Sequence, residues 1–248
     1  MNKYKEEFIE KTLEGLSEKI NYGRVGIRGF EFDNSALGKE CVLVIGLNPA
    51  GYEIAAEKEK KNRTYLYSLS DKNINSSYVY NNYYRPIYTL MNDIFNNEVK
   101  WHWCNKDWKN LREEIENSED NVFLDIIHEE YIKHKEKRIT IYVGDMFYYH
   151  ETNSRKLPLK GEYDYQSYCR DMLKLHIDFL TGSDKTIKFI YINNSQVSKW
   201  LCGDFLKTID NFENIPVFYG GMISGGKMDA FSKKRLVNEI RSYLKKSN

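Results

Sequence analysis

The stretch CVLVIGLNPAG, residues 41–51, decides the fold. It opens with five apolar residues, three of them β-branched, and this run stops at Gly46, as is typical of a strand buried inside a parallel sheet. Three later runs have the same character, namely ITIYVGD (139–145), IKFIYIN (187–193) and IPVFYGG (215–221). The chain therefore contains four predicted core strands.

Apolar residues at helical spacing lie between and beyond these strands. They predict a helix at the start of the chain, a helix from Arg85-Pro86, and helices over residues 164–180, 195–207 and 229–245. The alternation of strands and helices indicates one α/β domain, residues 1–248, with a three-layer α/β/α arrangement around a central four-stranded, mainly parallel sheet. Residues 96–138, which are charged and contain three Trp, are predicted to form a helical insertion.

The charge balance and the cysteine spacing exclude several classes of protein. With 37 Lys and Arg against 36 Asp and Glu, the net charge is +1, which excludes coating of nucleic acid by bulk charge but leaves room for a local basic groove. The four cysteines stand far apart, whereas zinc sites and iron–sulfur clusters need clustered thiolates, so we expect no metal and no other cofactor. The start is charged and no apolar run approaches about 18 residues, so we expect a cytoplasmic monomer without a membrane span.

Asn48 follows the first strand directly and precedes Pro49. Ligands of parallel sheets bind beyond the carboxyl ends of the strands. Because proline stiffens the backbone after Asn48, the amide at this place is suited to orienting a water or a substrate oxygen. Taken alone, the dipeptide favours a structural turn, since Asn-Pro is common in turns.

At the strand ends the sequence resembles the uracil-DNA glycosylase superfamily. The first strand of that family ends in a G-x-D/N-P motif, in which Asp or Asn positions the water that attacks the sugar carbon. GLNPAG, residues 46–51, is similar to the branch of the family that has Asn there and small residues after the Pro. The resemblance implies that Asn48 is catalytic and that Gly46, Leu47 and Ala50 line the base-binding site.

The resemblance continues in order along the chain. YLYS, residues 65–68, is similar to the segment whose aromatic ring stacks on the flipped base, which implies this role for Tyr67. The strand that ends at Asp145 resembles the strand whose end reads the base edge. His150, in the loop that follows, is a candidate for stabilising the leaving base, with a structural role as the alternative.

The last motif of the family has a different sequence in this chain. The family carries His or Asn followed by Pro-Ser, and the polar side chain stabilises the departing base anion. Here residues 220–224 read GGMIS, and losing such a donor typically costs on the order of 10²–10³ in rate. Backbone N–H groups, another side chain, or a function without cleavage are the alternatives.

Small and acidic residues at these motifs bear on the substrate. Uracil-strict members place Tyr where this chain has Ala50, and together with Gly220 and Gly221 this implies a roomier pocket; close backbone packing is the alternative for such small residues. Asp145 accepts from the N4 amino group of a cytosine but cannot donate to O4 of uracil. A solvated carboxylate at the end of a strand is the alternative.

A glycosylase must also hold DNA with the target nucleotide taken out of the stack. Met222 and Ile223 are candidates for an apolar wedge. A phosphate site is predicted where the glycine loop meets the following helix N-terminus. Its members are Ser224, Lys227, Ser232, Lys233 and Arg235, and a second basic cluster consists of Lys58, Lys60, Lys61 and Arg63. The alternative is that both charge runs are solvated faces.

These observations predict a DNA glycosylase that hydrolyses the N-glycosidic bond of a flipped, modified pyrimidine and leaves an abasic site. The roomy pocket favours a 5-substituted cytosine of phage DNA, hydroxymethylated or glucosylated, and hence a role in antiviral defence. The alternatives are a uracil or mismatch glycosylase in base-excision repair, a non-catalytic DNA-binding module with the same fold, and a small-molecule α/β enzyme.

Overall fold

The computed structural model describes residues 3–17, 39–48, 85–95, 125–132, 137–149, 151, 157, 159–161, 163–203, 207–223 and 227–246. The helices within these ranges are α1 (Lys3–Gly15), α4 (Arg85–Phe95), α6 (Tyr165–Gly182), α7 (Ser195–Cys202) and α8 (Ala230–Lys246). The strands are β1 (Glu40–Gly46), β2 (Asp125–Ile132), β3 (Lys137–Asp145), β4 (Thr186–Asn193), β5 (Ile209–Phe212) and β6 (Ile215–Gly220). None of the helices in these ranges is long and apolar enough to cross a membrane.

The strands form one six-stranded sheet in the order β2-β3-β1-β4-β6-β5. Its centre consists of the four predicted strands, since β1 pairs in parallel with β3 and with β4, and β4 pairs in parallel with β6. β2 and β5 are added antiparallel at the two edges. The predicted α/β fold with a mainly parallel sheet is confirmed, whereas the predicted number of four strands is wrong.

The two edge strands have sequences that do not stand out as strands. β5 is only four residues long, and it joins β6 through Glu213 and Asn214, whose φ angles of 50° and 66° are those of a tight hairpin turn. β2 lies inside residues 96–138, and its sequence DIIHEEYI mixes charged and apolar residues. It becomes a strand because it pairs with β3, so the prediction of a helical insertion is wrong for residues 125–132.

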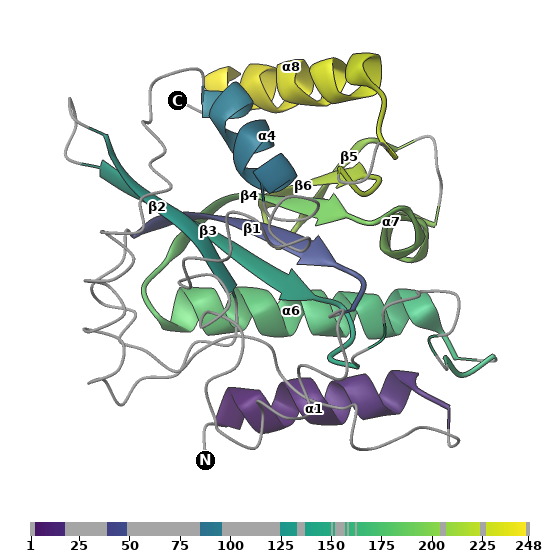
Figure 1. Ribbon diagram of the computed structural model, residues 1–248. Coiled ribbons are helices and arrows are strands. Elements are labelled where there is room, and N and C mark those ends of the chain that lie inside the picture. Colours follow the sequence, from purple (N-terminus) through teal and green to yellow (C-terminus); the bar gives the residue numbers. More distant parts are fainter. Residues whose placement is uncertain are drawn as a thin grey trace, which may run out of the picture.

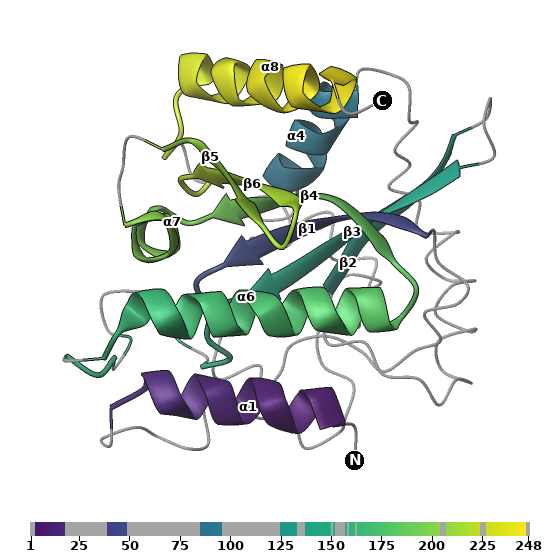
Figure 2. The same cartoon turned by 180° about the vertical axis from the view of Figure 1, so that it is seen from behind.

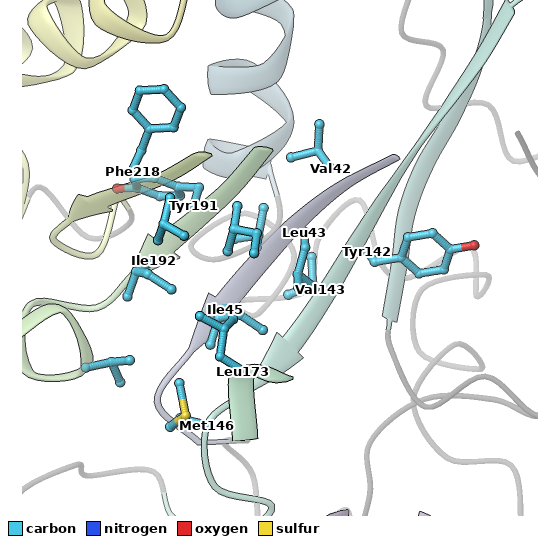
Figure 3. Close-up of a cluster of buried hydrophobic side chains, with 14 of the residues drawn as sticks. Val42, Leu43, Ile45, Tyr142, Val143, Met146, Leu173, Tyr191, Ile192 and Phe218 are labelled. Carbon is cyan, nitrogen blue, oxygen red and sulfur yellow. The ribbon is translucent and has the colours of Figure 1, made fainter. Parts of the chain in front are cut away.

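Helices lie on both faces of the sheet. α4 and α8 are on one face, and α6 is on the other, with α1 on the outer side of α6 (Figures 1 and 2). β1 lies in the middle of the sheet, and its residues 41–46 are all buried. Figure 3 shows side chains of the central strands packed together with Leu173 of α6 and with Met146. Because β3, β1, β4 and β6 run in parallel, their carboxyl ends lie at the same edge of the sheet.

The segment after β3 is bound to α6 and α1. The Tyr168 hydroxyl of α6 donates to the backbone carbonyl of Met146 at 2.5 Å, and the Phe147 ring stacks on Tyr168 with ring centroids 4.5 Å apart. The Tyr148 backbone N–H donates to Thr12 Oγ1 of α1 at 3.1 Å. These contacts fix the direction in which the chain leaves the carboxyl end of β3.

His176 of α6 is buried beside this segment. Its Nδ1 donates to the backbone carbonyl of Met172 at 2.8 Å, because a carbonyl can only accept, and Nε2 therefore accepts from the Tyr148 hydroxyl at 3.1 Å. The Phe8 ring packs edge-on against the imidazole with centroids 4.6 Å apart. Burial lowers the pKa of His176 to about 4, so the fold holds the neutral ring.

We expect the protein to lose stability as the pH falls from about 6.5 to about 4. The folded pKa of His176 is about 4 against about 6.5 for an unperturbed histidine, so its contribution is complete above pH 6.5 and is lost as the pH falls toward 4. The full effect is about 3 kcal/mol of unfolding free energy. Urea unfolding at about pH 7.5 and about pH 4.5 measures it in the wild type and in His176→Gln, which does not titrate. An identical pH dependence in the two proteins would contradict the assignment.

Candidate functional site

The carboxyl ends of the central strands form a row of small and polar residues. Gly46 at the end of β1 pairs with Asp145 at the end of β3. On the other side of β1, Ile45 pairs with Ile192, so that Asn193 follows at the level of Gly46. Asn193 in turn pairs with Gly220 at the end of β6. The structure thus brings the predicted strand-end motifs together in the order Asp145, Gly46, Asn193, Gly220.

Asn48 joins the end of β1 to the segment that follows β3. Backbone pairing continues past both strands, with Met146 N–H donating to the Gly46 carbonyl at 3.1 Å and Phe147 N–H donating to the Leu47 carbonyl at 2.8 Å. The half-buried Asn48 side chain then donates through Nδ2 to the carbonyls of Tyr149 at 3.2 Å and Glu151 at 2.8 Å.

The orientation of the Asn48 amide follows from these two bonds. Both hydrogens of Nδ2 are directed at backbone carbonyls, which cannot donate, so the nitrogen and oxygen of the amide cannot be exchanged. Oδ1 is therefore the atom of this side chain that can accept a hydrogen bond. The turn interpretation and the water-holding interpretation are compatible, because the same amide that fastens the turn also presents an oriented acceptor.

Asp145 is enclosed by the protein. Its side chain is only 3% exposed, which rules out the alternative of a solvated carboxylate at the end of a strand. An ionised carboxylate is costly to bury unless it is paired or hydrogen-bonded, so Asp145 stands where the fold supplies interactions for it. Leu47 is also buried and packs with the hydrophobic core.

The loop after β6 is held at three points. The Ser198 hydroxyl of α7 donates to the Gly220 carbonyl at 2.8 Å, and the Tyr191 hydroxyl of β4 donates to the Gly221 carbonyl at 2.7 Å. The Ile223 backbone N–H donates to Asn193 Oδ1 at 2.9 Å. Residues 220–223 are therefore fixed against β4 and α7.

The two predicted wedge residues differ in exposure. Ile223 is 9% exposed and belongs to the hydrophobic core, whereas Met222 is half-buried at the surface. Of the pair, Met222 is the residue whose side chain the structure leaves partly accessible.

Gly220 and Gly221 have different surroundings. A Cβ on Gly220 would lie 2.5 Å from the Tyr191 hydroxyl oxygen, so the alternative of close packing holds for this glycine. A Cβ on Gly221 would meet no atom of the described residues within 4 Å. Within the part of the chain that the structure describes, there is thus room for a larger residue at position 221 and not at position 220.

The amino end of α8 is closed by its own capping residue. The Asp229 carboxylate accepts from the N–H groups of Phe231 and Ser232, both at 2.9 Å, and from the Ser232 hydroxyl at 2.6 Å. The Ser232 hydroxyl is also the main reason why the pKa of Asp229 is lowered. Lys233 forms an ion pair with Asp93 of α4 at 2.8 Å. Ser232 and Lys233 are therefore engaged within the protein, whereas Lys227 is exposed.

The sequence does not predict a role for two residues near the strand ends, Asn193 and Phe231. Asn193 is the last residue of an apolar strand, and Phe231 is one of the apolar residues of a predicted helix. The Phe231 side chain is 81% exposed on the first turn of α8, which is unusual for a large apolar residue. Four predicted site residues lie outside the described residues, namely Ala50, Tyr67, His150 and Ser224, as do Lys58, Lys60, Lys61 and Arg63.

No group of three or more His, Cys, Asp or Glu is placed to hold a metal ion in the part of the chain that the structure describes. Cys41 and Cys169 are buried thiols, and burial raises the pKa of Cys41 to about 12. A thiol with so high a pKa is a poor nucleophile at neutral pH.

Comparison with protein-family models and with curated proteins finds no match to the chain.

Gly220→Ala should destabilise the protein, whereas Gly221→Ala should not. The new methyl group at position 220 overlaps the Tyr191 hydroxyl, and overpacking of this kind costs about 1–3 kcal/mol of unfolding free energy. The methyl group at position 221 contacts none of the described residues, so a change of less than about 1 kcal/mol is expected there. Urea unfolding of both variants measures the difference, and equal stabilities would contradict the close packing at Gly220.

Proposed function

We propose that the protein is a DNA glycosylase that hydrolyses the N-glycosidic bond of a flipped 5-substituted cytosine, hydroxymethylated or glucosylated, in phage DNA. The protein would act as a monomer in the cytoplasm and serve antiviral defence, with the three-layer α/β/α arrangement that the resemblance to uracil-DNA glycosylases implies. The helices on both faces of the sheet support this arrangement (Figure 1). The observation that carries the proposal is the oriented amide of Asn48 at the edge where the parallel strands end.

The oriented amide suits the placement of a water molecule. Asn48 Oδ1 accepts a hydrogen bond from the water, whose oxygen then faces C1′ of the flipped nucleotide. A neutral amide cannot take a proton from that water, so Asn48 positions the nucleophile and the sugar must develop positive charge before the attack. The C1′–N1 bond therefore breaks first, and its electron pair leaves with the base. The water oxygen then forms the C1′–O bond, and the proton that the water releases neutralises the base anion.

The buried carboxylate of Asp145 supports selection of an amino-pyrimidine. A carboxylate accepts from the exocyclic N4 amino group of cytosine and has no hydrogen to offer O4 of uracil. Because Asp145 is 3% exposed, water does not compensate a mismatched base at this place. The open space beside Gly221 supports room for a 5-substituent.

Surface residues beside the site support contact with DNA. Lys227, Lys234 and Arg235 are exposed around the start of α8, close in sequence to the exposed Phe231 ring. Aromatic rings next to cationic side chains bind unstacked bases and phosphates together. Since Asp229 occupies the amino end of α8, phosphate contacts in this proposal come from side chains and not from the helix N–H groups.

Release of free base from DNA with glucosylated hydroxymethylcytosine tests the proposal, with uracil-containing DNA assayed beside it. We expect release from the modified DNA alone, and a loss of about 10²-fold or more in Asn48→Ala because the water is no longer positioned. DNA binding by the variant, measured in parallel, shows that it remains folded.

Each other outcome overturns the proposal in a different way. Release from uracil DNA alone would indicate a repair glycosylase and remove the role of Asp145. Binding of both DNAs without release would indicate a DNA-binding module. No binding at low salt would indicate a small-molecule enzyme, because phosphate contacts strengthen as salt is lowered.

A further inference from the structure

Asn193 presents a buried donor whose orientation is fixed. The residue is 2% exposed, and its Oδ1 accepts from the Ile223 backbone N–H at 2.9 Å. Because a backbone N–H can only donate, this bond identifies the oxygen of the amide and leaves Nδ2 as the donor end. Nδ2 is buried and has no hydrogen-bond partner among the residues that the structure describes. A buried donor without a partner destabilises a fold, so this group calls for a functional explanation.

The position of Asn193 places this donor at the candidate site. Side chains alternate along β4, which puts Asn193 on the same face as Phe189, whose ring stacks on Phe95 of α4. Paired residues of parallel strands share a face, so Asp145, at the level of Gly46, belongs to the same face. The two polar residues are separated by β1, a distance of two strand spacings of about 4.8 Å each.

Gly46 stands between these two polar residues and has no side chain. Asp145 and Asn193 therefore flank one backbone position at the edge of the sheet. An acceptor residue and a donor residue on the same face, one on each side of Gly46, suit a flat ring that carries both an amino group and a carbonyl oxygen. A cytosine ring carries both groups on its Watson–Crick edge, where N4 and O2 lie on either side of N3.

The chemistry of base departure calls for such a donor. When the bond from C1′ breaks, the pyrimidine leaves with an electron pair, and much of the negative charge resides on O2. A hydrogen-bond donor already oriented toward that oxygen stabilises the charge as it develops. Residues 220–224 contain no side chain of this kind other than that of Ser224, and the N–H of Ile223 is already bound by Asn193.

We propose that Asn193 Nδ2 donates to O2 of the departing pyrimidine and stabilises the base anion. This inference rests on the proposed glycosylase activity and adds to it the group that supports the leaving base. Asn48 then acts on the side of the sugar and Asn193 on the side of the base.

The test is Asn193→Asp, which keeps an oxygen for the Ile223 N–H and replaces the donor by a second oxygen. We expect kcat for base release to fall by about 10²–10³, with a smaller change in KM, because the bond strengthens as charge develops. The defect should shrink for substrates with an electron-withdrawing 5-substituent, such as 5-fluorocytosine, since their base anions need less stabilisation. A structural role would lower the rate on all substrates alike.

Asn194→Asp is the matched control. Asn194 undergoes the same chemical change one residue along the chain, and its Oδ1 caps α7 by accepting from the N–H groups of Gln196 and Val197. Aspartate caps helices as well as asparagine does, so activity should be unchanged. Asn193→Ala, which introduces no buried carboxylate, is the second variant and should show the same dependence on the 5-substituent. Melting curves and DNA binding establish that each variant is folded.

The outcomes separate this inference from the proposed function. A wild-type protein that releases no base would overturn both. A wild-type protein that releases base, with Asn193→Asp and Asn193→Ala equally active or with a defect that does not depend on the leaving base, would overturn the role of Asn193 alone.

Discussion

Parallel pairing of β1 with a neighbour on each side is the constraint on which the rest of the structure depends. Because β1 is enclosed by β3 and β4 and covered on both faces, residues 41–46 must all be apolar or small. Parallel pairing also brings the carboxyl ends of the central strands to one edge. Residues 41–46 of β1 include no polar side chain other than a cysteine thiol, and the polar residues lie just beyond the strand at Asn48 or on its neighbours at Asp145 and Asn193.

The part of the fold that was predictable from the sequence is the part that burial controls. Each of the four central strands is an apolar run ending in Gly, Asp or Asn. These runs can be recognised in the sequence because strands that are buried on both faces consist almost entirely of apolar residues. The edge strands β2 and β5 take their conformation from a partner strand and have mixed or short sequences, which no local pattern distinguishes. Residues 125–132 are a strand because they pair with β3, and their own sequence does not indicate one.

The candidate site was predictable in its location but not in the role of each side chain. Asn48 and Asp145 are found at the expected edge because strand ends can be counted along a sequence. Gly220, by contrast, packs against Tyr191, a residue 29 positions earlier. The backbone N–H of the buried Ile223 is bound by Asn193, which is 30 positions earlier. Such distant contacts leave no periodicity in the sequence. The start of α8 is a further example. A phosphate site is predicted there, but the Asp229 carboxylate already accepts from the N–H groups that a phosphate would bind.

The three-point attachment of residues 220–223 has a consequence for how a partner molecule is accommodated. A loop that is already ordered loses little conformational entropy when it binds, and it also cannot adapt its shape to what it meets. If the partner is duplex DNA, the duplex must do the bending and unstacking, and the energy of that deformation depends on its sequence and on damage or modification. The protein would then sense the local stiffness of DNA along with the chemistry of a single base, at positions that none of its side chains touch.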